Sequence, residues 1–171
     1  MEKSEAYPAQ LQTLLRDAGW NATVVNAGRS GDTSAQGLRR LDWNLKQGPF
    51  DLVILALGAN DGLRRMDLES LEKNLSQMIE RFTQNKSRIL LCGLKLPINY
   101  DPKYRERFEG IFPKLAKQHR LTLLPFLLED VALSTDLNLN DLIHPNAEGH
   151  RIIARRLLTY VVPELEKLPL R

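Results

Sequence analysis

A carboxylate and an imidazole stand three residues apart near the C-terminal end of the sequence, at Asp141 and His144. Residues 140–146 read Asn-Asp-Leu-Ile-His-Pro-Asn, so a proline closes this short polar segment. Imidazole titrates closest to neutral pH, so it can take a proton from a hydroxyl nucleophile and return it to a leaving group. A carboxylate beside it fixes the tautomer of the ring and stabilises the imidazolium that forms. The spacing therefore predicts an acyl-transfer site in which His144 is the base and Asp141 orients it.

Two loops upstream contain groups that could stabilise a negative oxygen. Asn60, within the sequence Leu-Gly-Ala-Asn-Asp of residues 57–61, could donate from its amide to the oxyanion of a tetrahedral intermediate. Gly31, within residues 30–33, could present its backbone N–H to the same oxygen. Each loop also has a plainer interpretation, as an Asn-Asp turn that ends a strand and as a glycine that permits a positive φ. Taken alone, the two loops leave both interpretations open.

The remaining histidines and the single cysteine predict no further site. His119 lies in a polar turn, His150 falls within the last expected helix, and neither stands at ligand spacing to His144. We therefore expect no metal ion. Cys92 has no second cysteine with which to form an internal disulfide, and its leucine neighbours predict a buried small hydrophobe.

Length and composition bound the class of protein. The chain has 171 residues, of which 43% are hydrophobic and 26% charged, as in a soluble globular protein with one domain over residues 1–171. The net charge of +3 is too small to argue for a nucleic-acid partner. No apolar run approaches the ~20 residues of a membrane span, so we expect no stable membrane insertion.

The first five residues are polar and lack the apolar region of a secretory signal. The chain as it stands is therefore expected in the cytoplasm. Any signal for the periplasm or for secretion would lie upstream of Met1, which leaves the compartment open.

Apolar periodicity alternates between helix-like and strand-like segments, which favours an α/β fold. Strands are expected at residues 22–26, 51–57, 88–93 and 121–124. Helices are expected at residues 4–18, between residue 33 and the Gly48-Pro49 pair, and at residues 68–82, 102–118 and 146–161. This alternation predicts a flavodoxin-like parallel sheet between two helix layers, a three-layer α/β/α sandwich. Because ligands bind beyond the carboxyl ends of parallel strands, the loops at residues 28–33, 58–61 and 141–144 should meet on one rim.

Three sequence blocks carry a resemblance to a known family. Residues 30–34 (Ser-Gly-Asp-Thr-Ser), 58–61 (Gly-Ala-Asn-Asp) and 141–146 (Asp-Leu-Ile-His-Pro-Asn) resemble blocks II, III and V of the SGNH hydrolases, also called GDSL-type hydrolases. Four further segments are similar to the branch of arylesterases, acyl-CoA thioesterase I and lysophospholipase L1: residues 25–28, 96–100, 112–116 and 124–126. The resemblance extends from about residue 4 to the last expected helix.

The resemblance implies a serine esterase or thioesterase of the arylesterase, acyl-CoA thioesterase or lysophospholipase kind, which hydrolyses acyl esters or thioesters as small-molecule substrates and needs no cofactor. It assigns Gly31 and Asn60 as oxyanion-hole donors. It assigns His144 as the general base and Asp141 as the carboxylate that orients the base. Residues 96–100, which are apolar and aromatic, could line a groove for the acyl chain or could form a packed crossover.

The nucleophilic serine of the family belongs to block I, a Gly-Asp-Ser-Leu segment after the first strand, and this sequence contains no such segment. Its first residues resemble instead the part of the family pattern that follows block I. We therefore expect about twenty residues of the pattern to be missing, including the first, central strand and the nucleophile, and little or no esterase activity. The strands at residues 22–26 and 51–57 would then pair directly or leave a loose region.

Ser30 is the serine closest to the expected rim, but Asp32 stands where a Gly-x-Ser-x-Gly motif requires glycine. Ser4 is better explained as a helix cap.

Two other functional classes remain open, a non-catalytic remnant that binds acyl or glycan ligands and a carbohydrate esterase. A nucleotide-binding flavodoxin-like module is disfavoured, because no Gly-x-Gly-x-x-Gly or Walker pattern occurs. The sequence leaves the natural substrate, the acyl-chain length and the oligomeric state open.

Overall fold

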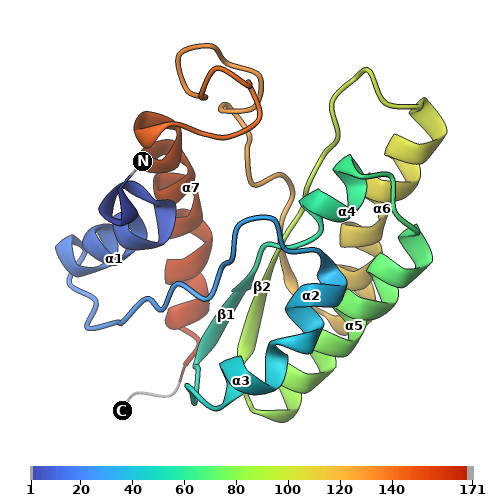
Figure 1. The fold of residues 1–171 in the computed structure, drawn as a ribbon. Helices are drawn as coiled ribbons and strands as arrows, with labels where there is room; N and C mark the ends of the chain where they lie inside the picture. The colour runs from blue at the N-terminus through green and yellow to red at the C-terminus, as the bar shows by residue number, and fades with distance from the viewer. Residues whose placement is uncertain (1, 169–171) are drawn as a thin grey trace. The chain divides into compact units, whose positions relative to one another are not determined.

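The computed structural model describes residues 2–168 and contains two compact units (Figure 1). One unit combines the N-terminal residues up to Gly28 with Leu127–Glu166, and the other contains Arg29–Phe126. Each unit holds one part of the expected site.

The second unit contains a parallel sheet of three strands in the order β1-β2-β3. The strands are β1 (Leu52–Leu55), β2 (Arg88–Cys92) and β3 (Thr122–Leu124). Their sequences are almost entirely apolar, as expected of strands in a parallel sheet, and β2 is buried along all of its residues except the first. In the register of the sheet, Leu55 pairs with Leu91 and Cys92 pairs with Leu124, so all three strands end at the same edge.

Five helices complete this unit: α2 (Ser34–Arg39), α3 (Leu41–Leu45), α4 (Ala59–Leu63), α5 (Leu68–Gln84) and α6 (Pro102–His119). Aspartates cap the two long helices at their first turns. The carboxylate of Asp67 accepts from the backbone N–H of Ser70 at 2.8 Å. Asp101 caps α6 in the same way through the N–H of Tyr104 at 2.9 Å. Both helices pack against β2 and provide the crossovers that a parallel sheet requires.

The first unit contains a 3₁₀ turn, η1 (Lys3–Glu5), and two helices, α1 (Tyr7–Asp17) and α7 (Ala147–Leu165), which pack against each other. The buried apolar side chains of these helices include Leu11, Leu15, Ile153, Leu157 and Val161. Asn146 caps α7, because its side-chain oxygen accepts from the backbone N–H groups of Glu148 and Gly149, both at 3.0 Å. This cap fixes the start of α7 directly after the segment that contains His144.

The expected strand at residues 22–26 is wrong, because these residues belong to no strand. The side-chain amide of Gln12 satisfies part of this backbone in place of a neighbouring strand. Its Nε2 donates to the carbonyl of Ala22 and its Oε1 accepts from the N–H of Val24, both at 2.6 Å. Residues 2–168 therefore contain three strands, whereas the sequence predicts four.

The α/β class with a short parallel sheet is confirmed. The helix expected after residue 33 is interrupted at Arg40, between α2 and α3. The first long helix starts at Tyr7, so the prediction of Ser4 as its cap is wrong, and Ala6 occupies the cap position. No helix within residues 2–168 has the length and apolar character needed to cross a membrane.

Candidate active site

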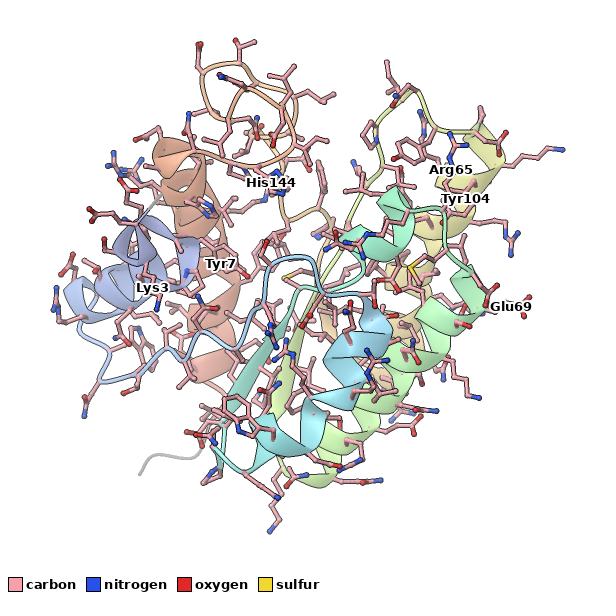
Figure 2. The ribbon with its side chains drawn as sticks, in the orientation of Figure 1. Lys3, Tyr7, Arg65, Glu69, Tyr104 and His144 are labelled. Atoms are coloured by element: carbon pink, nitrogen blue, oxygen red, sulfur yellow. The ribbon has the colours of Figure 1, made fainter. Side chains whose placement is uncertain are left out.

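Figure 2 shows His144 in the segment that precedes α7. Its imidazole is hydrogen-bonded to the carboxylate of Asp141. Nδ1 of the imidazole lies 2.7 Å from Oδ2 of Asp141. The other carboxylate oxygen, Oδ1, accepts from the backbone N–H groups of Ile143 and His144, each at 2.9 Å. One oxygen is therefore held by the loop backbone, and the other is directed at the ring.

These hydrogen bonds lower the pKa of Asp141 to about 2, from its ordinary value of 3.8. The largest cause is the backbone N–H of His144, followed by the side-chain hydrogen bond to the same residue and the N–H of Ile143. The carboxylate is ionised at neutral pH and can only accept hydrogen bonds, so Nδ1 of His144 must carry the proton. Nε2 of the neutral ring is then the free basic nitrogen, which is the tautomer that a general base requires.

Backbone hydrogen bonds close the loop that carries this pair. The N–H of Leu139 donates to the carbonyl of His144 at 2.8 Å, and the N–H of Asn146 donates to the carbonyl of Leu137 at 2.9 Å. Leu142 adopts a left-handed φ of 57°, which turns the chain between the two arms of the loop. The aspartate and imidazole side chains remain 46% and 68% exposed, so a substrate can reach them from solvent.

Gly31 and Asn60 lie close together in the second unit, where the loop before α2 meets the start of α4. The amide Nδ2 of Asn60 donates to the carbonyl of Asp32 at 3.0 Å, which leaves the second N–H of this amide for another acceptor. Arg64 joins the two loops, because its Nη2 donates to the carbonyl of Gly31 at 3.2 Å and to Oδ1 of Asn60 at 3.4 Å. Gly31 has a φ of 80°, so the alternative interpretation of this residue, as a glycine that permits a positive φ, is also correct.

A buried network that sequence reasoning missed fixes the relative position of these two loops. The carboxylate of Asp61, only 3% exposed, accepts from the backbone N–H of Ser34 at 2.8 Å and from its hydroxyl at 2.6 Å. Asn74 of α5 donates to the same hydroxyl at 3.0 Å. Asp61 thus ties the start of α2 to α4, next to Gly31 and Asn60. The sequence offered one indication of this contact, because Ser34 and Asp61 are the last residues of the blocks at residues 30–34 and 58–61.

The structure brings together two pairs among the four predicted site residues. Asp141 contacts His144 in the first unit, and Gly31 lies beside Asn60 in the second unit, where both contact Arg64. The meeting of the two pairs on one rim and their roles in catalysis stay predictions.

The other two histidines have partners of their own. Nε2 of His119 lies 3.0 Å from the hydroxyl of Ser76, and Nδ1 of His150 accepts from the backbone N–H of Tyr7 at 3.3 Å. Burial lowers the pKa of His150 and raises the pKa of the Cys92 thiol to about 12, which favours the uncharged form of both groups. In the part of the chain that the structure describes, no group of three or more His, Cys, Asp and Glu side chains could hold a metal ion.

Comparison with known proteins identifies relatives along almost the whole chain. Residues 2–152 match the GDSL-like Lipase/Acylhydrolase family. The chain is 39% identical to esterase TesA of Pseudomonas aeruginosa over 168 residues, which cover 98% of this chain and 82% of that protein. It is 43% identical to thioesterase 1/protease 1/lysophospholipase L1 of Escherichia coli over 155 residues, which cover 90% of this chain and 73% of that protein.

The fold is shared with solved structures as well. A crystal structure of TesA matches with a TM-score of 0.92 at 36% identity, and the match covers 96% of this chain and 91% of that chain. The Asp141–His144 pair, the residues around Gly31 and Asn60, and all three strands lie within residues 2–152, the part that matches the family. By its sequence and its fold, this chain belongs to the GDSL-like lipase/acylhydrolase family, the ester-bond hydrolases also known as SGNH hydrolases.

Proposed function

We propose that this chain carries the base and the oxyanion-stabilising groups of a hydrolase that cleaves acyl esters or thioesters. His144 is the general base, Asp141 orients it, and Gly31 and Asn60 donate to the oxyanion. The hydrogen bond of 2.7 Å between His144 and Asp141 carries this proposal, because an ionised carboxylate on Nδ1 leaves Nε2 as the base. The substrate class is supported by relatives that are named as an esterase, an arylesterase and a thioesterase/lysophospholipase.

The proposed reaction proceeds through a covalent acyl intermediate. A hydroxyl attacks the carbonyl carbon while Nε2 of His144 takes its proton, and the carbonyl oxygen becomes an oxyanion. The N–H of Gly31 and the amide of Asn60 donate to that oxyanion, and one such donor is worth about 3 kcal/mol of transition-state stabilisation. The imidazolium then protonates the leaving alcohol or thiol. Water deprotonated by His144 attacks the acyl group, which releases the carboxylic acid and restores the hydroxyl.

In this proposal the nucleophilic hydroxyl is not supplied by any serine of the sequence. The family segment Gly-Asp-Ser-Leu does not occur in the 171 residues. Ser30, the nearest alternative, is followed by Gly31 and Asp32 and lacks the glycine pattern of a nucleophile turn. Without the nucleophile, a base and an oxyanion hole retain only about 10³–10⁴-fold acceleration over water, so we expect little or no turnover by this chain.

A version of the chain with the missing nucleophile segment added tests the roles assigned to His144 and to the absent serine. The chain is assayed on p-nitrophenyl butyrate and on an acyl-CoA, beside a version with a strand and Gly-Asp-Ser-Leu joined ahead of α1. We expect hydrolysis only by the grafted version, and loss of that hydrolysis in its His144→Ala variant. The matched control is His119→Ala in the grafted version, which should keep its activity because this histidine contacts Ser76 instead.

Two results would contradict the proposal. Turnover by the ungrafted chain that disappears in Ser30→Ala would assign the nucleophile to Ser30. Hydrolysis by the grafted version that survives His144→Ala would remove His144 from the mechanism.

A further inference from the structure

Four arginines line one hollow in the second unit. The hollow has a volume of about 470 Å³, within the ~300–1,000 Å³ that is usual for small-molecule sites. Its lining includes Arg29, Arg39, Arg40 and Arg64, together with Gly31 and the single acidic residue Asp32. The lining therefore carries an excess of positive charge.

Two of these arginines are held by the protein itself. The guanidinium of Arg40 forms an ion pair with Asp32, to which its Nε donates at 2.8 Å and its Nη2 donates as well. Arg64 donates to the carbonyl of Gly31 at 3.2 Å. The acidic residue of the hollow is thus already paired, and it does not neutralise the other arginines.

Arg29 and Arg39 differ from these two. Within residues 2–168, neither guanidinium has a hydrogen-bond or ion-pair partner, and both residues are exposed. Positive groups gathered around one hollow repel each other, and they raise the local concentration of anions. A guanidinium matches a phosphate with two parallel N–H donors, so the arrangement favours a phosphate over an uncharged polar group.

We propose that this hollow is a subsite for a phosphate group of the acyl substrate, with Arg29 and Arg39 as its main ligands. The inference deepens the proposed function and rests on it, because Gly31 lines the hollow and is also the proposed oxyanion donor. The loop that contains Arg29 and Gly31, together with Arg39 of α2, would then bind the reacting carbonyl and the phosphate of the same substrate molecule. Thioesters of coenzyme A and lysophospholipids are the two sources of such a phosphate, and the chemistry that the arginines recognise is common to both.

Isothermal titration calorimetry on the chain as it stands tests the subsite without any need for turnover. The probes are coenzyme A, glycerophosphocholine, inorganic phosphate, and pantetheine, which carries no phosphate. We expect coenzyme A, glycerophosphocholine or both to bind, with an affinity that falls as salt is added, and pantetheine to bind far more weakly. In Arg29→Gln/Arg39→Gln, the Kd of the bound probe should rise about tenfold or more, because charge-assisted hydrogen bonds are lost.

Two further variants serve as controls. Arg16→Gln/Arg155→Gln removes the same charge from exposed positions in the first unit, and its Kd should equal that of the original chain. Arg29→Lys/Arg39→Lys keeps the charge but loses the paired donors, so its Kd should be intermediate. This graded order also separates lost recognition from misfolding, which would abolish binding in both variants of the hollow.

The pattern of probes decides the outcome. Binding of coenzyme A alone identifies a thioester substrate, and binding of glycerophosphocholine alone identifies a phospholipid substrate. Binding of both probes supports the shared phosphate chemistry. The proposal is overturned by binding of inorganic phosphate alone, by equal binding of pantetheine, by no binding of any probe, or by a Kd that Arg29→Gln/Arg39→Gln leaves unchanged. The proposed function fails in a different assay, through hydrolysis of uncharged p-nitrophenyl butyrate that is independent of His144, so the two failures are distinguishable.

Discussion

The carboxylate of Asp61 accepts two hydrogen bonds from Ser34, one from its backbone N–H at 2.8 Å and one from its hydroxyl at 2.6 Å. Both residues are buried, and they end the sequence blocks that contain Asn60 and Gly31. The positions of the two proposed oxyanion donors therefore depend on a buried polar network beside them.

Replacing Asp61 by alanine should destabilise the second unit. Asp61→Ala leaves the N–H and the hydroxyl of Ser34 without this acceptor. Each unsatisfied buried group costs about 1–3 kcal/mol, so the free energy of unfolding should fall by about 2–6 kcal/mol. Urea unfolding followed by circular dichroism measures the change. Asp17→Ala, at an exposed position of α1, is the control and should change the free energy by less than about 0.5 kcal/mol. Equal, small effects of both substitutions would contradict the importance of the network.

Because the pKa of Asp141 is low, the free energy of unfolding should depend on pH in the acid range. Its folded-state pKa of about 2 lies below the ordinary value of 3.8, so the ionised group stabilises the folded state above about pH 4. That contribution is lost as the pH falls toward 2. The stability difference between the original chain and Asp141→Asn should therefore be constant above about pH 4 and shrink as the pH falls below it. Urea midpoints measured over a series of pH values give this difference, and a difference independent of pH would speak against the hydrogen-bonded carboxylate.

Gly149 allows the loop that contains Asp141 and His144 to lie close to α7. A Cβ at this position would lie 2.3 Å from the carbonyl oxygen of Leu137 and 3.0 Å from the Cβ of Pro145. Gly149→Ala should displace the loop and lower the free energy of unfolding by about 1–3 kcal/mol. Thermal unfolding measures the loss, and faster amide exchange in residues 137–146 reports the displacement.

Gly110 provides the matched control for this substitution. Nothing lies within 4 Å of a Cβ at Gly110, in α6, so Gly110→Ala should raise the free energy of unfolding by about 0.5–1 kcal/mol. A loss of stability in Gly110→Ala as large as that in Gly149→Ala would contradict the steric explanation.

Gln12 should hold residues 22–26 in place. Gln12→Ala removes the donor to Ala22 and the acceptor from Val24, so the free energy of local opening should fall by about 1–3 kcal/mol. Native-state amide exchange of Val24 measures this change. Gln12→Glu is a sharper comparison, because it keeps the acceptor for Val24 and loses only the donor to Ala22. Unchanged exchange at Val24 in both variants would show that other contacts hold the segment.

The features that the sequence predicted correctly depend on local patterns. Asp141 and His144 lie three residues apart in one loop, so their contact requires no knowledge of distant packing. The strands β1, β2 and β3 lie within two residues of the expected ends, because each is a continuous apolar run between polar or glycine-containing loops.

The features that the sequence missed depend on partners far along the chain. Residues 22–26 have the composition of a strand, but a strand requires a neighbouring strand, and the amide of Gln12 serves this backbone instead. The contact between Ser34 and Asp61 joins residues 27 positions apart, and it forms only when α2 and α4 pack together. Periodicity contains no information about either contact.

The central claim is that the Asp141–His144 pair and the Gly31–Asn60 pair meet at one ester-cleaving centre. The distance between Nε2 of His144 and Nδ2 of Asn60, measured in a crystal structure of the chain, tests this claim most directly. The account predicts that both atoms face one cleft within about 8 Å of each other, the span of two hydrogen bonds of ~3 Å and the tetrahedral group between them. An imidazole and an amide that open onto separate surfaces, farther apart than one acyl group can bridge, would contradict it.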